Sequence, residues 1–222
     1  MPYRKTHFIN EHFYHALNRG IGKKLIFKSN GDYQRALQIT DFYRFSKPPL
    51  KFSSFLRLSA KDKSAFFKNL HKNTPLIEII SYCFMPNHTH FLLRQTLNNG
   101  ISKFMANWQN SYARYFNTKY SQKGYLFESS FKAKPIESED LLWHVSRYIH
   151  LNPSTASLVS INNLKSYPWS SFPEYLELGK SGFTETKQIL DHFKGRKAYQ
   201  DFVYNQAAYQ KKLKKIRNLI LE

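Results

Sequence analysis

The segment "PLIEIISYCFMPNHTHFLLRQ", residues 75–95, decides the fold of this chain. Two runs rich in β-branched and aromatic residues flank Met85-Pro86-Asn87, a combination that is typical of a turn between strands. Two strands joined by so short a connection pair antiparallel. The segment therefore predicts a β-hairpin.

Two histidines, His88 and His90, stand one residue apart in the second strand of this hairpin. Side chains at i and i+2 of a strand project from the same face, roughly 7 Å apart at ~3.3 Å per residue. Two imidazoles at this spacing could hold one metal ion between them. Two such histidines more often make ordinary hydrogen bonds, so the pair alone is a weak indication of a metal site.

Local patterns predict the other elements of the chain. Alternation predicts a strand at 12–20, and apolar spacing with cap residues predicts helices at 29–45, 64–73, 101–120, 138–153 and from about 184, with a hairpin or extended segment at 124–137. Ser138 is the expected N-cap of the helix 138–153, and Pro153 is expected to end it. This order of elements favours an α+β fold, with helices against one face of an antiparallel sheet.

The composition indicates a folded, strongly basic protein. Hydrophobic residues make up 41% of the 222 residues, and 34 Lys and Arg stand against 15 Asp and Glu, a net charge of +19. Such an excess on a folded domain favours a polyanionic partner, most often nucleic acid. With one cysteine, no secretory signal pattern and no run of ~20 apolar residues, we expect a cytoplasmic protein that is not inserted in a membrane.

The helix at 138–153 carries "RYIHLNP", in which Tyr148 and Asn152 are four residues apart. Residues at i and i+4 of a helix share one face. An aromatic side chain at helical spacing is more often part of a core, and an Asn before a proline is more often a cap. Spacing alone therefore assigns neither residue to a site.

Several motifs together resemble one family. The stretches "MPNHTHFLL", "ISKFMANWQNSYARYFNTKY", "GYLFESSFKAK", "SRYIHLNP" and "YPWSSF", in this order, resemble the REP-associated tyrosine transposases, which are single-tyrosine HUH transposases of the insertion-sequence type. "HALNRG" at 15–20 is similar to the first strand of that family. The resemblance extends from about residue 8 to about residue 175.

This resemblance implies a fold, an activity and a set of site residues. The fold is a ferredoxin-like or RRM-like antiparallel sheet, here with a transposase domain at 1–175 and a basic, mainly helical C-terminal extension at 176–222. The activity is cleavage and rejoining of single-stranded or hairpin DNA through a 5′-phosphotyrosine. By the resemblance, His88 and His90 form the histidine pair, Tyr148 is the nucleophile, and Asn152 is the third ligand of the metal ion.

The implied chemistry needs a divalent cation, because an anionic phosphodiester resists attack until its charge is stabilised. Two neutral imidazoles and an amide oxygen suit Mn²⁺, while Mg²⁺ would retain more water, and the sequence does not choose between them. Relatives work as monomers or as homodimers, so the oligomeric state stays open. The basic residues expected to contact DNA are Arg4, Lys5, Arg19, Lys23, Lys24, Lys132, Lys134, Lys211, Lys212, Lys214, Lys215 and Arg217.

Two other functions compete with the transposase prediction. A basic RRM-like domain could bind nucleic acid without cutting it. A structural zinc-binding interaction protein could use the same histidines, in which case removal of the ion would unfold the domain.

Overall fold

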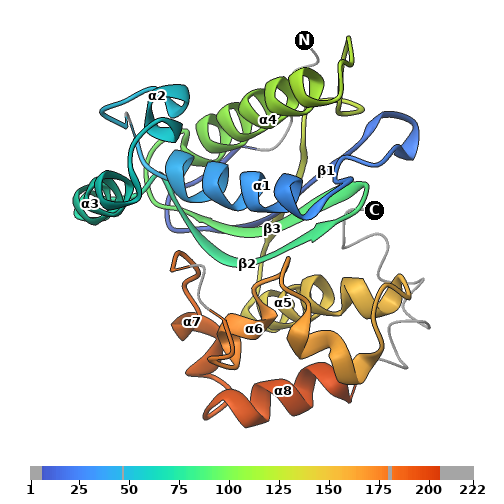
Figure 1. Ribbon diagram of the computed structural model, residues 1–222. Coiled ribbons are helices and arrows are strands. Elements are labelled where there is room, and N and C mark those ends of the chain that lie inside the picture. Colours follow the sequence, from blue (N-terminus) through green and yellow to red (C-terminus); the bar gives the residue numbers. More distant parts are fainter. Residues whose placement is uncertain (1–6, 47, 180–181, 206–222) are drawn as a thin grey trace.

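The computed structural model describes residues 7–46, 48–179 and 182–205. A four-stranded antiparallel sheet has the order β2-β3-β1-β4 (Figure 1). Its strands are β1 (Phe13–Arg19), β2 (Ile77–Met85), β3 (His88–Gln95) and β4 (Lys132–Ile136). The predicted hairpin is confirmed, since β2 and β3 pair along their length. Met85 lies opposite His88 at the turn, and only Pro86 and Asn87 connect the two strands.

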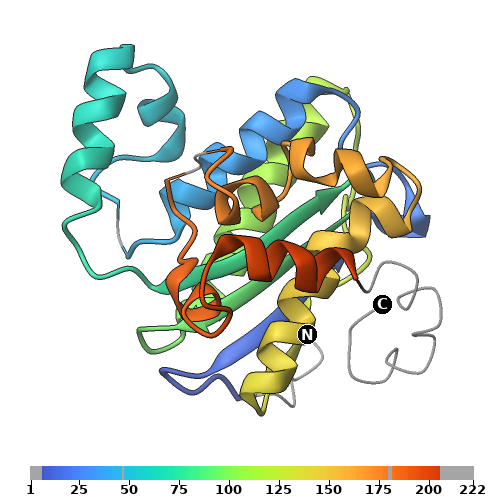
Figure 2. The same cartoon turned by 90° about the horizontal axis from the view of Figure 1, so that it is seen from below.

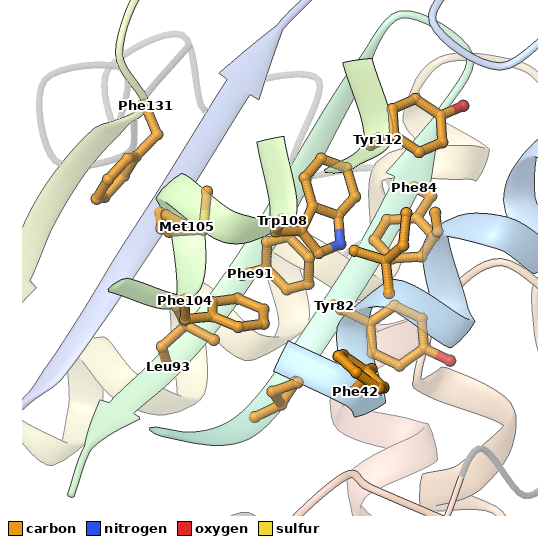
Figure 3. Close-up of a cluster of buried hydrophobic side chains, with 14 of the residues drawn as sticks. Phe42, Tyr82, Phe84, Phe91, Leu93, Phe104, Met105, Trp108, Tyr112 and Phe131 are labelled. Carbon is orange, nitrogen blue, oxygen red and sulfur yellow. The ribbon is translucent and has the colours of Figure 1, made fainter. Parts of the chain in front are cut away.

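Helices α1 (Asn30–Tyr43) and α4 (Gly100–Lys119) cover one face of the sheet (Figure 1). A capping box formed by Ser29 and Asp32 starts α1. The core between these helices and the sheet is dominated by aromatic rings (Figure 3), with Trp108 of α4 packed against Phe84 and Phe91 of the strands. The apolar stripe that predicted a helix at 101–120 is the buried face of α4.

A short helical insertion separates α1 from β2. It consists of α2 (Phe52–Leu56) and α3 (Ala60–Leu70), and it lies beyond one end of α1 in both views (Figures 1 and 2). Ser59 caps α3 by accepting a hydrogen bond from the Asp62 backbone N–H at 3.1 Å. The insertion is held to α1 by aromatic contacts of Phe42 with Phe55 and Phe66.

The opposite face of the sheet is covered by described residues that follow β4 (Figure 2). The long helix α5 (Glu139–Thr155) lies on this face. The described residues after it form the short elements η2 (Ile161–Ser166), α6 (Phe172–Tyr175), α7 (Lys187–Leu190) and α8 (Arg196–Tyr204). The Ser138 hydroxyl caps α5 by accepting from the Leu141 N–H, as predicted. The helix continues two residues past Pro153, so the predicted end was slightly early.

A buried polar network joins α5 to α8. The Tyr199 hydroxyl lies 2.7 Å from Ser146 Oγ and 2.8 Å from His150 Nδ1. Ser146 Oγ lies 2.8 Å from Ser81 Oγ of β2, and His150 Nε2 lies 2.8 Å from Ser171 Oγ. The network therefore connects the sheet, α5 and α8 in one buried unit.

The predicted α+β class and antiparallel sheet are confirmed. The order β1-α1-β2-β3-α4-β4 with spatial order β2-β3-β1-β4 is that of a ferredoxin-like unit. The helices, however, cover both faces of the sheet rather than one, because α5 and the elements after it form a second hydrophobic core with β2 and β3. The division at residues 175 and 176 stays a prediction, although α7 and α8 contribute Ile189, Tyr199 and Val203 to this second core.

None of the helices in the described part of the chain is long and apolar enough to cross a membrane.

Candidate active site

Three histidines meet on the face of the sheet that α5 covers. His88 and His90 alternate with Thr89 along β3, and His15 lies on the neighbouring central strand β1. The His15 and His90 rings are nearly parallel with centroids 5.2 Å apart, and the His88 and His90 centroids are 4.9 Å apart. The register of β1 against β3 thus adds a third imidazole to the predicted pair.

Helix α5 places Tyr148 against these histidines. Its residues Val145 and Ile149 are fully buried, which fixes the face that the helix turns to the sheet. The Tyr148 ring then meets His90 edge-on with centroids 5.6 Å apart, and it lies 6.1 Å from the His15 ring. The structure therefore brings the predicted nucleophile and the predicted histidine pair together within one subunit.

Asn152 lies one helical turn beyond Tyr148 and is 7% exposed. Its Nδ2 donates a hydrogen bond to the Tyr148 carbonyl oxygen at 3.1 Å. The amide nitrogen is thereby directed at the helix backbone, and the side-chain oxygen Oδ1 is left to accept or to coordinate.

The hydrogen bonds of His88 define which of its nitrogens can bind a metal. His88 Nδ1 lies 2.6 Å from Asn87 Oδ1, while Asn87 Nδ2 donates to the Lys23 carbonyl oxygen at 3.3 Å. Because a carboxamide oxygen can only accept, Nδ1 of His88 carries the proton in this bond. The lone pair of the neutral ring is therefore on Nε2, which is the atom available for a metal ion.

His90 offers one nitrogen to a ligand. Its Nδ1 lies 3.0 Å from His15 Nε2, and its Nε2 is buried with no hydrogen-bond partner among the described residues. A buried polar atom without a partner is costly, so such an atom usually marks a missing ligand. Together with His88 Nε2 and Asn152 Oδ1, this atom gives a donor set that fits a divalent cation.

All three imidazoles are neutral at pH 7. Burial, and next the positive charge of Arg19, lowers the pKa of His88 to about 4. Burial, and next Lys134, lowers the pKa of His15 to about 3. Burial, and next the neighbouring His88, lowers the pKa of His90 well below its ordinary value. Only an unprotonated imidazole can coordinate a metal, so these shifts favour metal binding.

Within residues 7–46, 48–179 and 182–205, no group of three or more His, Cys, Asp or Glu side chains is arranged to hold a metal ion. His15 is not part of such a group, and its Nε2 bonds to His90 Nδ1. A metal site here depends on the amide of Asn152, as the resemblance implied, or on oxygens from water and substrate.

Several of the predicted DNA-binding residues lie beside the histidines. Arg19 is opposite His88 in the register, and Lys132 and Lys134 of β4 are opposite Leu17 and His15, so all three are on the histidine face of the sheet. Lys23 and Lys24 are exposed in and after the short helix η1 (Ile21–Lys23). The other predicted contacts lie outside the described residues, and these are Arg4, Lys5, Lys211, Lys212, Lys214, Lys215 and Arg217.

Two residues of the site were missed by the sequence motifs. His15 and Asn87 each make a hydrogen bond to one histidine of the pair. The alternation of the strand at 12–20 places His15 on one face with Phe13 and Leu17, but only pairing with β3 brings it to His90. Asn87 precedes His88 in the turn, and an asparagine at this position predicts the turn but not a contact with His88.

Comparison with known proteins gives one family model and a similar solved fold. The family model described as "Transposase IS200 like" matches residues 59–152. The solved structure of a REP-associated tyrosine transposase bound to a REP hairpin is similar with a TM-score of 0.52 and 13% identity, over 83% of this chain and 92% of that chain. At this identity the likeness shows a shared fold.

A tRNA(His) guanylyltransferase from Saccharomyces cerevisiae covers 85% of this chain and 79% of its own at 13% identity, but with a TM-score of only 0.31. No curated protein matches the chain. The segment that matches the IS200-like transposase model, residues 59–152, contains the histidine pair, Tyr148 and Asn152, and the match agrees with the resemblance that the sequence motifs indicated.

Proposed function

We propose that this protein cleaves and rejoins single-stranded DNA next to a hairpin, with Tyr148 as the nucleophile and with a divalent cation bound by His88, His90 and Asn152. The observation that carries the proposal is the position of the Tyr148 ring, 5.6 Å from the ring of a buried histidine whose Nε2 has no hydrogen-bond partner among the described residues. The solved relative that was bound to a REP hairpin supports DNA of this kind as the substrate.

In this proposal the Tyr148 oxygen attacks the phosphorus of the scissile phosphodiester. A bond forms between the tyrosine oxygen and phosphorus, the bond from phosphorus to the 3′ oxygen breaks, and the phenolic proton leaves to solvent while the 3′ oxygen takes one up. The products are a 5′-phosphotyrosine and a free 3′-hydroxyl. A second 3′-hydroxyl can reverse the reaction, so rejoining needs no ATP.

When bound, Mg²⁺ or Mn²⁺ would supply a Lewis acid that stabilises negative charge on the scissile phosphate. The side chains of the protein bind the DNA and position the tyrosine. Arg19, Lys132 and Lys134 line the β1 and β4 side of the site and attract the DNA backbone. Helix α5 holds the tyrosine close to the histidines, so no subunit exchange is needed to assemble the site.

The test uses fluorescent hairpin oligonucleotides with single-stranded flanks, incubated with the full-length protein and Mn²⁺ and resolved on a denaturing gel. Wild-type protein should form a covalent adduct, and Tyr148→Phe should bind the same hairpins without forming it. The matched control is Tyr125→Phe, since Tyr125 is 89% exposed. An undiminished adduct with Tyr148→Phe would mean that another tyrosine attacks.

His88→Ala separates the proposal from its two competitors. The variant should lose the adduct while its thermal unfolding stays cooperative. If removal of His88 instead unfolds the domain, the ion is structural. If wild-type protein binds the hairpins but forms no adduct with any divalent cation, the protein is a binding module.

A further inference from the structure

His15 of β1 is the only side chain in the described part of the chain that bonds to His90, and it lies outside residues 59–152, the segment that the family model matches. Both rings are fully buried, and His15 Nε2 lies 3.0 Å from His90 Nδ1. The nitrogens on the far sides, His15 Nδ1 and His90 Nε2, have no hydrogen-bond partner among the described residues. The pair therefore exchanges a single hydrogen bond inside the sheet–helix interface.

This bond admits two arrangements of the protons. If His90 Nδ1 donates to His15 Nε2, the lone pair of His90 is on Nε2. If His15 Nε2 donates, the proton of His90 is on Nε2, and neither nitrogen of His90 can coordinate a metal without breaking the bond. Only the first arrangement agrees with the unpartnered Nε2 as a ligand atom.

We infer that His15 is a positioning residue, which accepts the Nδ1 proton of His90 and so presents the His90 Nε2 lone pair to a divalent cation. The inference rests on the proposed function. Metal-bound histidines commonly donate their second ring N–H to such a partner, which fixes both the tautomer and the orientation of the ring. Here the partner is a neutral imidazole rather than a carboxylate, so the bond adds no negative charge beside the scissile phosphate.

His88 has a corresponding partner on the other side of the site. Its Nδ1 is held by Asn87 Oδ1 at 2.6 Å, and the Asn87 amide is held in turn by the Lys23 carbonyl oxygen. Both histidines of the pair thus bond through Nδ1 to a side chain that can accept, and both leave Nε2 for a ligand. The two acceptors differ in type and in position, His15 on β1 and Asn87 in the β2–β3 turn, yet they select the same tautomer.

The test compares His15→Leu, which removes the acceptor, with His15→Gln, whose side-chain oxygen can reach the place of Nε2. Mn²⁺ affinity of the full-length protein is measured by calorimetry, with folding checked by thermal unfolding. We expect Kd for Mn²⁺ to rise about 10–100-fold in His15→Leu and to return to within about threefold of wild type in His15→Gln. Wild-type affinity in His15→Leu, or equal losses in both variants, would overturn the role of His15.

Nitrogen-15 NMR of the imidazoles in the metal-free wild-type protein gives a second measurement that needs no variant to fold. His90 should carry its proton on Nδ1 and show an unprotonated Nε2. A proton on Nε2 would overturn the inference even if the protein binds metal and forms the DNA adduct. Conversely, a protein that has the expected tautomer but forms no adduct would contradict the proposed function and leave the hydrogen-bond assignment standing.

Discussion

The buried hydroxyl of Tyr199 offers a quantitative test of how helix α5 is held. This hydroxyl bonds to Ser146 and His150, two residues of the helix that carries Tyr148. Tyr199→Phe removes the oxygen and leaves the ring in place. His150 Nδ1 then loses its partner, whereas Ser146 keeps its bond to Ser81 at 2.8 Å.

The expected cost follows from this difference. One buried polar group left without a partner costs about 1–3 kcal/mol. We therefore expect Tyr199→Phe to lower the free energy of unfolding by about 2 kcal/mol. For a chain of this size, each kcal/mol lowers Tm by about 2–4 °C, so Tm should fall by about 4–8 °C.

Tyr204→Phe on the same helix is the matched control. The Tyr204 hydroxyl is buried and has no hydrogen-bond partner among the described residues, so its removal should leave Tm unchanged or raise it. Both variants are compared by calorimetry and by urea unfolding at pH 7. Equal Tm values for the two variants would refute the reasoning that the network anchors α5.

Three further predictions concern pH, packing and DNA. Burial lowers the pKa values of His15 and His150 to about 3, so below pH ~6.5 the unfolded chain binds protons that the native chain does not. The free energy of unfolding should therefore fall by about 2 kcal/mol per histidine between pH 7 and pH 5. Urea unfolding that is unchanged at pH 5 would contradict this prediction. Gly100→Ala should destabilise the fold by about 3 kcal/mol, since its Cβ would lie 2.1 Å from the Leu76 carbonyl oxygen, whereas Gly31→Ala, with nothing nearer than 3.7 Å, should be neutral or slightly stabilising in the same unfolding assay. Lys132→Ala should reduce the slope of log K against log salt for hairpin binding by about 1, and Lys61→Ala on α3 should leave it unchanged; equal slopes for the two variants would remove Lys132 from the DNA contacts.

The parts of the fold that local signals determine were predictable from the sequence. The β2–β3 hairpin, the buried stripe of α4 and the Ser138 cap of α5 each depend on residues close together in the chain. The position of β1 between β3 and β4 depends on pairing between residues at least 69 positions apart, and no local pattern contains it.

The sequence of β2 does indicate that helices cover both faces of the sheet, and the prediction of helices on one face overlooked this. Ile77–Met85 is buried at every position but Glu78 and does not alternate between apolar and polar residues. Strands buried on both faces have such continuous apolar runs. For the candidate site, the spacing of His88 with His90 and of Tyr148 with Asn152 allowed a shared site but did not predict one. The prediction that these residues act together came from the resemblance to a family.

The central place of β3 in the sheet has a consequence for how the site can move. From His88 to Arg94, every residue of β3 has a partner on both neighbouring strands. Amide protons in such a position exchange with solvent mainly through global unfolding, so those of the histidine strand should be among the slowest in the molecule. If the protein cleaves DNA as proposed, any rearrangement during the reaction would involve the nucleic acid and side-chain rotation, because the backbone that carries the two histidines is paired on both sides.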